Sequence, residues 1–328
     1  MQIASLMHVP KTNRDVAWLK DSLQAAVELE LSTVPVYLSG MWSIKTQAGE
    51  VYDHIKQVVF EEMLHLGLVC NLLTTIGGTP QIATTTAVPK FPGPLPGGVR
   101  PNLTVYLAGL TRQMVNEVFM EIEYPQSGPI AFALTTTYPT IGDFYDAVLD
   151  AFIQNASAIA GTKQLTASNS LLGELKAVNT LDDARKALGT IKEQGEGTTQ
   201  SPNAADFGGS LAHYYKFGEI YHGNKLVKTD AGAWKYEGDP VPFPEVFPVA
   251  RVPAEGYPNL PEAVAFDKLY TVLLKQLEKA WATGDQDELD DAMLLKMRDL
   301  TGPARALMQK PLDAGGYTYG PCFRLVTS

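Results

Sequence analysis

The chain has 328 residues, of which 45% are hydrophobic and 19% are charged, a composition typical of a folded globular protein. Its formal net charge of −10, with no basic cluster of five or more residues, argues against nucleic acid and anionic membrane surfaces as partners. The two cysteines, Cys70 and Cys322, are too far apart to suggest a disulfide framework, and neither a secretory leader nor an apolar run of about 18 residues is visible, so we expect a cytoplasmic protein.

The first long helix is expected over residues 13–47. Pro35 lies inside this pattern and predicts a kink or a local irregularity. Glu30 falls on the apolar stripe of the helix, whereas the same steps taken from Glu28 meet polar residues, so Glu30 is the inward candidate and Glu28 is expected in solvent. The stripe recurs at steps of three and four, with one longer step, through Val16, Leu19, Leu23, Ala26, Val34, Tyr37, Met41 and Ile44.

A second helix is expected over residues 50–76, ending at the pair Gly77 and Gly78. Its buried seam is unbroken, and the two middle positions are Glu62 and His65. The seam runs in steps of four and three through Val51, Ile55, Val58, Glu62, His65, Val69, Leu72 and Ile76. An unpaired carboxylate there would cost several kcal/mol, and a metal ion would offset that cost. For one such motif alone, a solvated glutamate and a hydrogen-bonded core histidine remain the simpler interpretation.

The rest of the chain predicts an all-α protein, because no alternating strand pattern persists. Residues 79–101 and 223–259 are rich in Pro and Gly and are expected as a loop and a wrapping segment. We predict a single domain over 1–328, a four-helix bundle with additional helices and long Pro/Gly-rich loops, in which 223–328 is a wrapping segment and C-terminal helical extension. The core helices are expected at about 13–47, 50–76, 178–196 and 204–222, with further helices at about 103–122, 140–159, 261–283 and 286–309.

The last core helix repeats the Glu-x-x-His spacing with Glu219 and His222. Its apolar stripe reads Ala212, Tyr215, Glu219, His222, Leu226. Two helices that each carry this pair make half of a carboxylate-bridged dimetal site, which needs one more glutamate from each of the other two helices. Glu30 can supply one of them. The third helix offers Glu193 and Glu196. Its apolar stripe runs between them and does not indicate which of the two faces inward.

Four segments in order resemble the ferritin-like domain of the iminophenyl-pyruvate dimer synthase family, whose members act in bisindole pigment pathways such as violacein. They are "ELELSTVPVYLSGMWSI" (28–44), "EEMLHLGLVCNLLTTIGGTP" (61–80), "EQGEGT" (193–198) and "HYYKFGEIYHG" (213–223). The resemblance extends to the C-terminal "GGYTYGPCFRL" and covers most of the chain. Two departures matter: many relatives have histidine where this chain has Leu31, and the pigment-pathway enzymes are larger proteins.

The resemblance implies a ferritin-like four-helix core with a set of metal ligands: Glu30, Glu62, His65, Glu196, Glu219 and His222. Glu196 is preferred because its Gly-Glu-Gly setting is similar to the family's signature, and Glu193 is the alternative. His213 also matches the family pattern, but nine residues at roughly 100° each place it about 180° around the helix from His222. We therefore expect His213 in the second layer around the metals or in the core.

The function expected from these residues is a non-haem dimetal oxidoreductase that acts on a small organic substrate, such as an amino-acid-derived imine, with O₂ or a peroxide. Two iron ions are expected, and Mn or Zn would accept the same ligands. Tyr37 and Tyr215 are candidate catalytic residues and lie, like Tyr221, near predicted ligands; ordinary packing is the simpler explanation for all three. Iron storage and a metal-free scaffold are the alternatives, and homo-oligomer formation is left open.

Overall fold

The computed structural model describes residues 3–125, 141–169, 173–196, 201–203, 210–293, 297–312 and 315–327. The mostly helical fold expected from the sequence is confirmed. The α-helices are α1 (Ile3–Met7), α2 (Val16–Ser43), α3 (Glu50–Thr75), α4 (Arg112–Met114), α5 (Met120–Ile122), α6 (Ile141–Gln154), α7 (Leu181–Glu196), α8 (His213–His222), α9 (Pro261–Thr283), α10 (Gln286–Asp291) and α11 (Met297–Gln309). A π-helical turn, η3 (Val115–Phe119), joins α4 to α5, and short 3₁₀ turns lie at Lys11–Asn13, Pro96–Gly98 and Ala156–Ala158.

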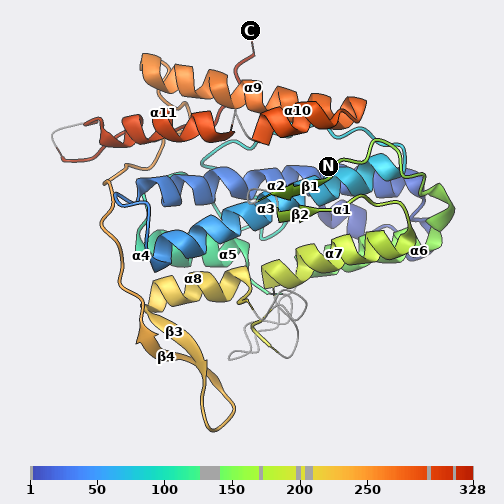
Figure 1. Cartoon of the computed structure of the whole chain (residues 1–328), viewed down its shortest axis with the longest axis horizontal. Helices are drawn as coiled ribbons and strands as arrows, with labels where there is room; N and C mark the ends of the chain where they lie inside the picture. The colour runs from blue at the N-terminus through green and yellow to red at the C-terminus, as the bar shows by residue number, and fades with distance from the viewer. Residues whose placement is uncertain are drawn as a thin grey trace.

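The centre of the molecule is the long pair α2 and α3, which lie side by side (Figure 1). The Asp15 carboxylate caps the start of α2 by accepting a hydrogen bond of 2.9 Å from the backbone N–H of Trp18. From Ser22 to Ser43 nearly every residue of α2 is buried, as expected for a helix that is apolar almost all round. The expectation that Glu28 faces solvent is therefore wrong. The helix also continues through Pro35.

Shorter helices cover one side of this pair. α7 and α8 follow one another along that side, and α6 lies beside α7 (Figure 1). Two predicted helices begin about ten residues later than expected. The helix predicted at 103–122 begins only at Arg112, because the chain before it pairs its backbone with other segments, for example Val105 with Gly93 and Gly109 with Val249. The helix predicted at 204–222 begins at His213, and residues 204–209 lie outside the described part of the chain.

The C-terminal helices α9, α10 and α11 lie on the opposite side of α2 and α3 (Figure 1). The Trp281 indole N–H donates to the side-chain carbonyl of Asn71 at 2.9 Å, which ties α9 to α3. The Arg305 guanidinium donates to the carbonyls of Trp42, Ile44 and Lys45 at the end of α2, so it satisfies groups that the helix leaves free. These contacts fix the C-terminal helices on the central pair.

Two small antiparallel sheets were not expected. β1 (Ala167–Asn169) pairs with β2 (Gly173–Leu175), and β3 (Asn224–Lys228) pairs with β4 (Trp234–Pro240). The β3–β4 hairpin follows α8 directly and projects from the body of the molecule (Figure 1). It occupies the start of the segment that the sequence predicted as wrapping.

Helix α3 is long and apolar enough to cross a membrane by length and composition. In the structure 89% of its most apolar window is buried inside the protein. The core position of α3 explains its apolar sequence.

Candidate metal centre

Three carboxylates and two imidazoles meet inside the bundle, all of them buried. Their exposed fractions are Glu30 4%, Glu62 3%, His65 2%, Glu123 8% and His213 0%. Glu30 comes from α2, Glu62 and His65 from α3, Glu123 from the residue after α5, and His213 from the first residue of α8. Four separate segments therefore build one cluster of oxygen and nitrogen atoms.

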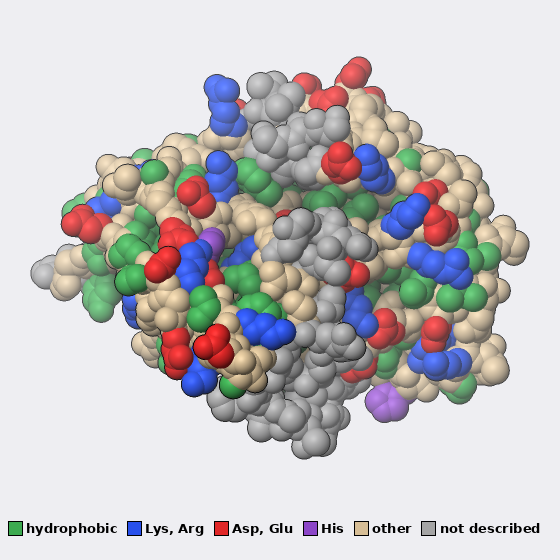
Figure 2. Space-filling view, turned by 60° about the horizontal axis from the view of Figure 1, so that its bottom comes forward, with side chains coloured by type: hydrophobic (Ala, Val, Ile, Leu, Met, Phe, Trp, Pro, Cys, Tyr) green, Lys and Arg blue, Asp and Glu red, His purple; other side chains and the backbone are tan. Residues whose placement is uncertain are grey.

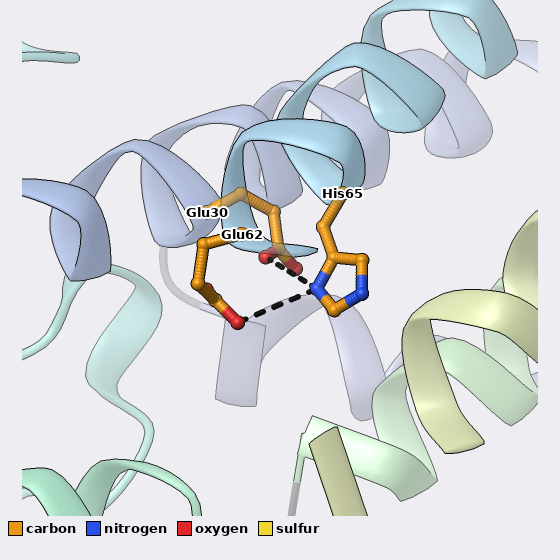
Figure 3. Close-up of side chains that lie close together, drawn as sticks. All are labelled: Glu30, Glu62 and His65. Atoms are coloured by element: carbon orange, nitrogen blue, oxygen red, sulfur yellow. Dashed lines mark ion pairs between the residues drawn. The ribbon is translucent and has the colours of Figure 1, made fainter. Parts of the chain in front are cut away.

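The first half of the cluster consists of Glu30, Glu62 and His65 (Figure 3). His65 Nδ1 lies 3.4 Å from Glu62 Oε1 and 3.7 Å from Glu30 Oε2. The three side chains point toward one another from two adjacent helices (Figure 3). They are the residues that the stripes of the first two predicted helices selected.

The second half consists of Glu62, Glu123 and His213. His213 Nδ1 lies 3.0 Å from Glu62 Oε1 and 3.5 Å from Glu123 Oε2, and this buried nitrogen has no hydrogen-bond partner in the described structure. The same oxygen, Glu62 Oε1, thus lies next to the Nδ1 atoms of both histidines. Glu62 is shared by the two halves.

The outer atoms of the five side chains already have hydrogen-bond partners. The carboxylate oxygen that faces away from the cluster accepts a hydrogen bond from a hydroxyl group in each case. Tyr145 donates to Glu30 Oε1, Thr33 donates to Glu62 Oε2 at 2.5 Å, and Tyr37 donates to Glu123 Oε1 at 2.5 Å. Each histidine donates its Nε2–H outward, His65 to Gln194 Oε1 at 2.8 Å and His213 to Glu61 Oε2 at 2.9 Å. With the protons on Nε2, both Nδ1 lone pairs face carboxylate oxygens.

This arrangement needs positive charge at its centre. Burial and the nearby Glu62 carboxylate raise the pKa of Glu30 to about 8, and the same two causes raise the pKa of Glu123. Burial alone would lower the pKa of His65 and of His213, but the surrounding carboxylates outweigh it, and both pKa values are raised. In the metal-free protein, protons are drawn to the space between the five side chains.

The residues also fit metal ions. For metal–ligand distances of about 2.1 Å, two donors at 90° to each other lie about 3.0 Å apart, and donors at a tetrahedral angle about 3.4 Å apart. The nitrogen–oxygen distances of 3.0–3.7 Å in the cluster lie at or slightly above this spacing. Carboxylate and imidazole donors without thiolate suit iron, manganese and zinc. The orphaned Nδ1 of His213 is the atom that such an ion would satisfy.

The α7 side of the centre is only partly described. One carboxylate oxygen of Glu193, Oε2, is buried without a hydrogen-bond partner in the described structure. Glu196 is the last residue of α7, and its side chain lies outside the described part. The choice between Glu193 and Glu196 as a ligand stays a prediction.

The expected placement of Glu219 and His222 next to Glu62 is wrong. Glu219 is buried, but its Oε2 accepts from His54 at 2.8 Å and from Lys225 at 3.0 Å, and its Oε1 accepts from the backbone N–H of Leu226 at 2.8 Å. Glu50 belongs to the same group and pairs with Lys225. Glu50, His54 and Glu219 thus form a separate cluster, in which the Lys225 ammonium provides the positive charge.

His222 is exposed and stacks on Tyr236 of the β3–β4 hairpin, with ring centroids 4.3 Å apart. The hairpin can approach because Gly218 has no side chain: a Cβ there would lie 1.9 Å from the Tyr236 hydroxyl oxygen. The 180° separation of His213 from His222 holds in the structure, but the inward residue is His213. His213 was expected in the second layer around the metals or in the core, and the structure buries it next to Glu62 and Glu123.

The three candidate tyrosines lie in different places. Tyr37 contacts the centre through Glu123, whereas Tyr215 packs against Tyr214 and Tyr221 packs against His222. Sequence reasoning missed Glu123, Thr33, Tyr145, Glu61 and Gln194. Glu123 follows Val115 and Phe119 at steps of four in the sequence, but these steps cross the π-helical turn η3, so α-helical periodicity is a weak signal for it.

These observations define the class of protein: a helical bundle with a buried carboxylate–histidine centre suited to two metal ions. The family model described as "Ferritin-like" matches residues 23–222, and the chain belongs to the ferritin-like family. A crystal structure of a ferritin-like protein from Caulobacter vibrioides is similar over 92% of this chain and 97% of that chain, with a TM-score of 0.66 and 23% identity, which shows the shared fold. A search of curated proteins finds no match.

Proposed function

We propose that this protein is a non-haem dimetal carboxylate oxidoreductase acting on a small organic molecule. One observation carries the proposal: five buried side chains direct nitrogen and oxygen atoms at one another, while every outer atom is held by a hydrogen bond. Glu30, Glu62 and His65 would hold one ion, and Glu62, Glu123 and His213 the other. Glu62 would bridge the two ions.

Two such ions supply electron transfer and Lewis acidity at the same point when they are bound. The protein's share is to hold the ligands and to control protons at defined oxygens. Tyr37 carries the proton nearest to Glu123 Oε1, and Tyr145 the one nearest to Glu30 Oε1. We keep Tyr37 as a candidate for proton or hydrogen-atom delivery, and Tyr145 joins it on the same geometric ground.

Part of the immediate surroundings is apolar. Leu29, Ile122 and Ile191 line the small space beside Glu30 and Glu62. Apolar walls keep water away and leave electrostatic interactions at the centre strong. Such a site suits chemistry on an organic molecule that water would otherwise divert.

A cleft of about 950 Å³ lies between α3, β2 and α7, a volume in the range of small-molecule sites. Its lining includes the apolar side chains of Phe60, Leu64 and Leu68 and the ammonium group of Lys56. Glu61 and Gln194, which hold the two histidines, are on its wall. We propose this cleft as the place where the organic substrate binds.

For the substrate we propose an amino-acid-derived imine. The support is the resemblance of four sequence segments to the iminophenyl-pyruvate dimer synthases. A lining that combines apolar side chains with an ammonium group suits an apolar substrate that carries a carboxylate. Where Figure 2 colours side chains by type, acidic and basic groups are intermixed rather than gathered into a basic patch, which argues against a nucleic-acid partner.

The first test is metal binding. The metal-free protein is loaded anaerobically with Fe(II), Mn(II) or Zn(II) in turn, and bound metal is measured by elemental analysis after gel filtration. We expect two ions per chain and, for iron, the Mössbauer signature of a coupled pair. Less than one ion per chain with every metal would refute the proposal and favour a metal-free scaffold.

The second test is turnover. The iron-loaded, reduced protein is mixed with O₂ and with α-imino acids generated from aromatic and aliphatic amino acids, and O₂ consumption is followed together with product mass. Consumption that depends on an imino acid supports the oxidoreductase. Full metal occupancy without any substrate-dependent consumption would refute this substrate class.

A further inference from the structure

The two histidines of the centre are held by chemically different groups. His65 Nε2 donates to the neutral amide oxygen of Gln194 at 2.8 Å. His213 Nε2 donates to the carboxylate of Glu61 at 2.9 Å. Both bonds point away from the shared oxygen of Glu62, so neither acceptor touches the metal positions themselves.

The Glu61 carboxylate is fixed by two further donors. Lys216 Nζ lies 2.9 Å from the same oxygen that accepts from His213, and Gln57 Nε2 donates to the other oxygen at 2.9 Å. The Lys216 side chain is 3% exposed and needs a counter-charge, which Glu61 provides. Glu61 is therefore held as a charged acceptor behind His213.

A charged acceptor changes a histidine ligand more than a neutral one does. An imidazole whose remote N–H is bonded to a carboxylate becomes a more basic ligand, and hydrogen bonds to charged groups are about twice as strong as neutral ones. The Nδ1 of His213 should accordingly bind a metal ion more tightly than the Nδ1 of His65. The bridging Glu62 contributes to both positions and does not remove the difference.

We infer that the two metal positions are unequal, with the tighter one at Glu62, Glu123 and His213, and that Glu61 and Gln194 are the positioning residues that set the difference. This inference rests on the proposed dimetal function. It predicts an ordered filling of the centre, first beside His213 and then beside His65.

The test is an anaerobic titration of the metal-free protein with Co(II), followed by calorimetry and by the visible absorption of the bound ion. Wild type should bind two equivalents in two steps whose Kd values differ at least ~10-fold. His213→Gln should remove the tight step and keep the weak one, whereas His65→Gln should do the reverse. The tight step surviving in His213→Gln would overturn the inference.

Two variants exchange the acceptors. Glu61→Gln combined with Lys216→Met makes both acceptors neutral without leaving a buried ammonium unpaired, and it should weaken the tight step ~10–100-fold. Gln194→Glu makes both acceptors charged and should strengthen the weak step. Lys186→Met, at an exposed pair with Asp182 on α7, is the matched control and should change neither step.

Circular dichroism and thermal melting establish whether each variant is folded. If the double variant is unfolded, the effect of Gln194→Glu on the weak step tests the inference. Two equal binding steps in wild type, or both steps unchanged in folded acceptor variants, would overturn the inference and leave the dimetal proposal intact. Absence of Co(II) binding in wild type would instead refute the dimetal proposal itself.

Discussion

The chain contains two Glu-x-x-His motifs on two helices, and their surroundings differ completely. Around Glu62 and His65 the buried partners are two more carboxylates and a second imidazole. Around Glu219 the partners are His54, Lys225 and a backbone N–H, and His222 lies at the surface. Among the described residues, no lysine or arginine pairs with the carboxylates of the first group, whereas Lys225 pairs with Glu50 and Glu219 in the second.

The difference comes from position along the bundle axis. His213 contacts Glu61, and six residues later Glu219 contacts His54, so α8 runs antiparallel to α3 and moves toward its start. At 1.5 Å per residue, six residues carry the chain about 9 Å beyond the centre. Spacing along a helix identifies residues on one face, but it does not say at which level of the bundle that face meets its neighbours.

The largest effect should come from removing the shared carboxylate. Glu62→Gln takes one ligand from each metal position, and loss of a direct ligand should exceed the ~10–100-fold cost known for residues behind the ligands. We expect bound Fe(II) or Co(II) to fall from two ions to less than one per chain, measured by elemental analysis. Glu219→Gln is the matched control and should keep two. Equal losses in both variants would mean that the two motifs act in one site.

For the stability of the metal-free protein, we expect Glu219→Gln to have a larger effect than Glu62→Gln. Glu219 satisfies three donors, and Glu219→Gln leaves at least one of them without an acceptor, at a cost of about 1–3 kcal/mol in the free energy of unfolding. Urea denaturation followed by circular dichroism measures this cost. Glu237→Gln, which alters only an exposed pair with Lys235, should cost less than about 0.5 kcal/mol. A Glu219→Gln protein as stable as wild type would show that this cluster is not structural.

The stabilisation by Glu219 should depend on pH. Burial raises the pKa of Glu219, but the hydrogen bonds from His54, Leu226 and Lys225 outweigh it, and the pKa is lowered from its ordinary value of 4.5. The folded state thus favours the carboxylate, so the stabilisation is present above pH 4.5 and disappears as the pH falls through the lowered pKa. The difference in unfolding free energy between wild type and Glu219→Gln should be largest near pH 7 and shrink below pH 4.5. A difference that is constant from pH 7 to pH 3 would contradict this assignment.

Periodicity within one long helix predicted part of the centre well. The stripes of the first two predicted helices selected Glu30, Glu62 and His65, and the structure brings these three together (Figure 3). α2 and α3 are long and joined by a short connection, so a stripe on each must face the other over many turns. α9 also has the predicted bounds, Pro261–Thr283, because Pro starts it and Gly284 ends it in the left-handed conformation.

The rest of the centre depends on irregular backbone, which periodicity does not describe. Glu123 follows a helix that contains the π-helical turn η3, and such a turn shifts by one residue which side chains face inward. His213 opens α8, so its level in the bundle is set by the segment before it rather than by the helix itself. Glu61 accepts a hydrogen bond from His213, and Gln194 accepts one from His65. Each of these pairs joins two different helices, so the sequence alone does not reveal it.

The smallest effect, and the most direct check of which face of α8 points inward, is expected for His222→Gln. The His222 ring is exposed and makes a stacked contact with Tyr236, worth about 0.5–1 kcal/mol of stability. Metal content and both Co(II) binding steps should match wild type, and the melting temperature should fall by only a few degrees. His213→Gln, nine residues earlier on the opposite face, should lose one ion per chain. If His222→Gln lost an ion instead, α8 would have to be rotated by half a turn in the metal-bound protein, and the second motif would regain the role that its spacing predicted.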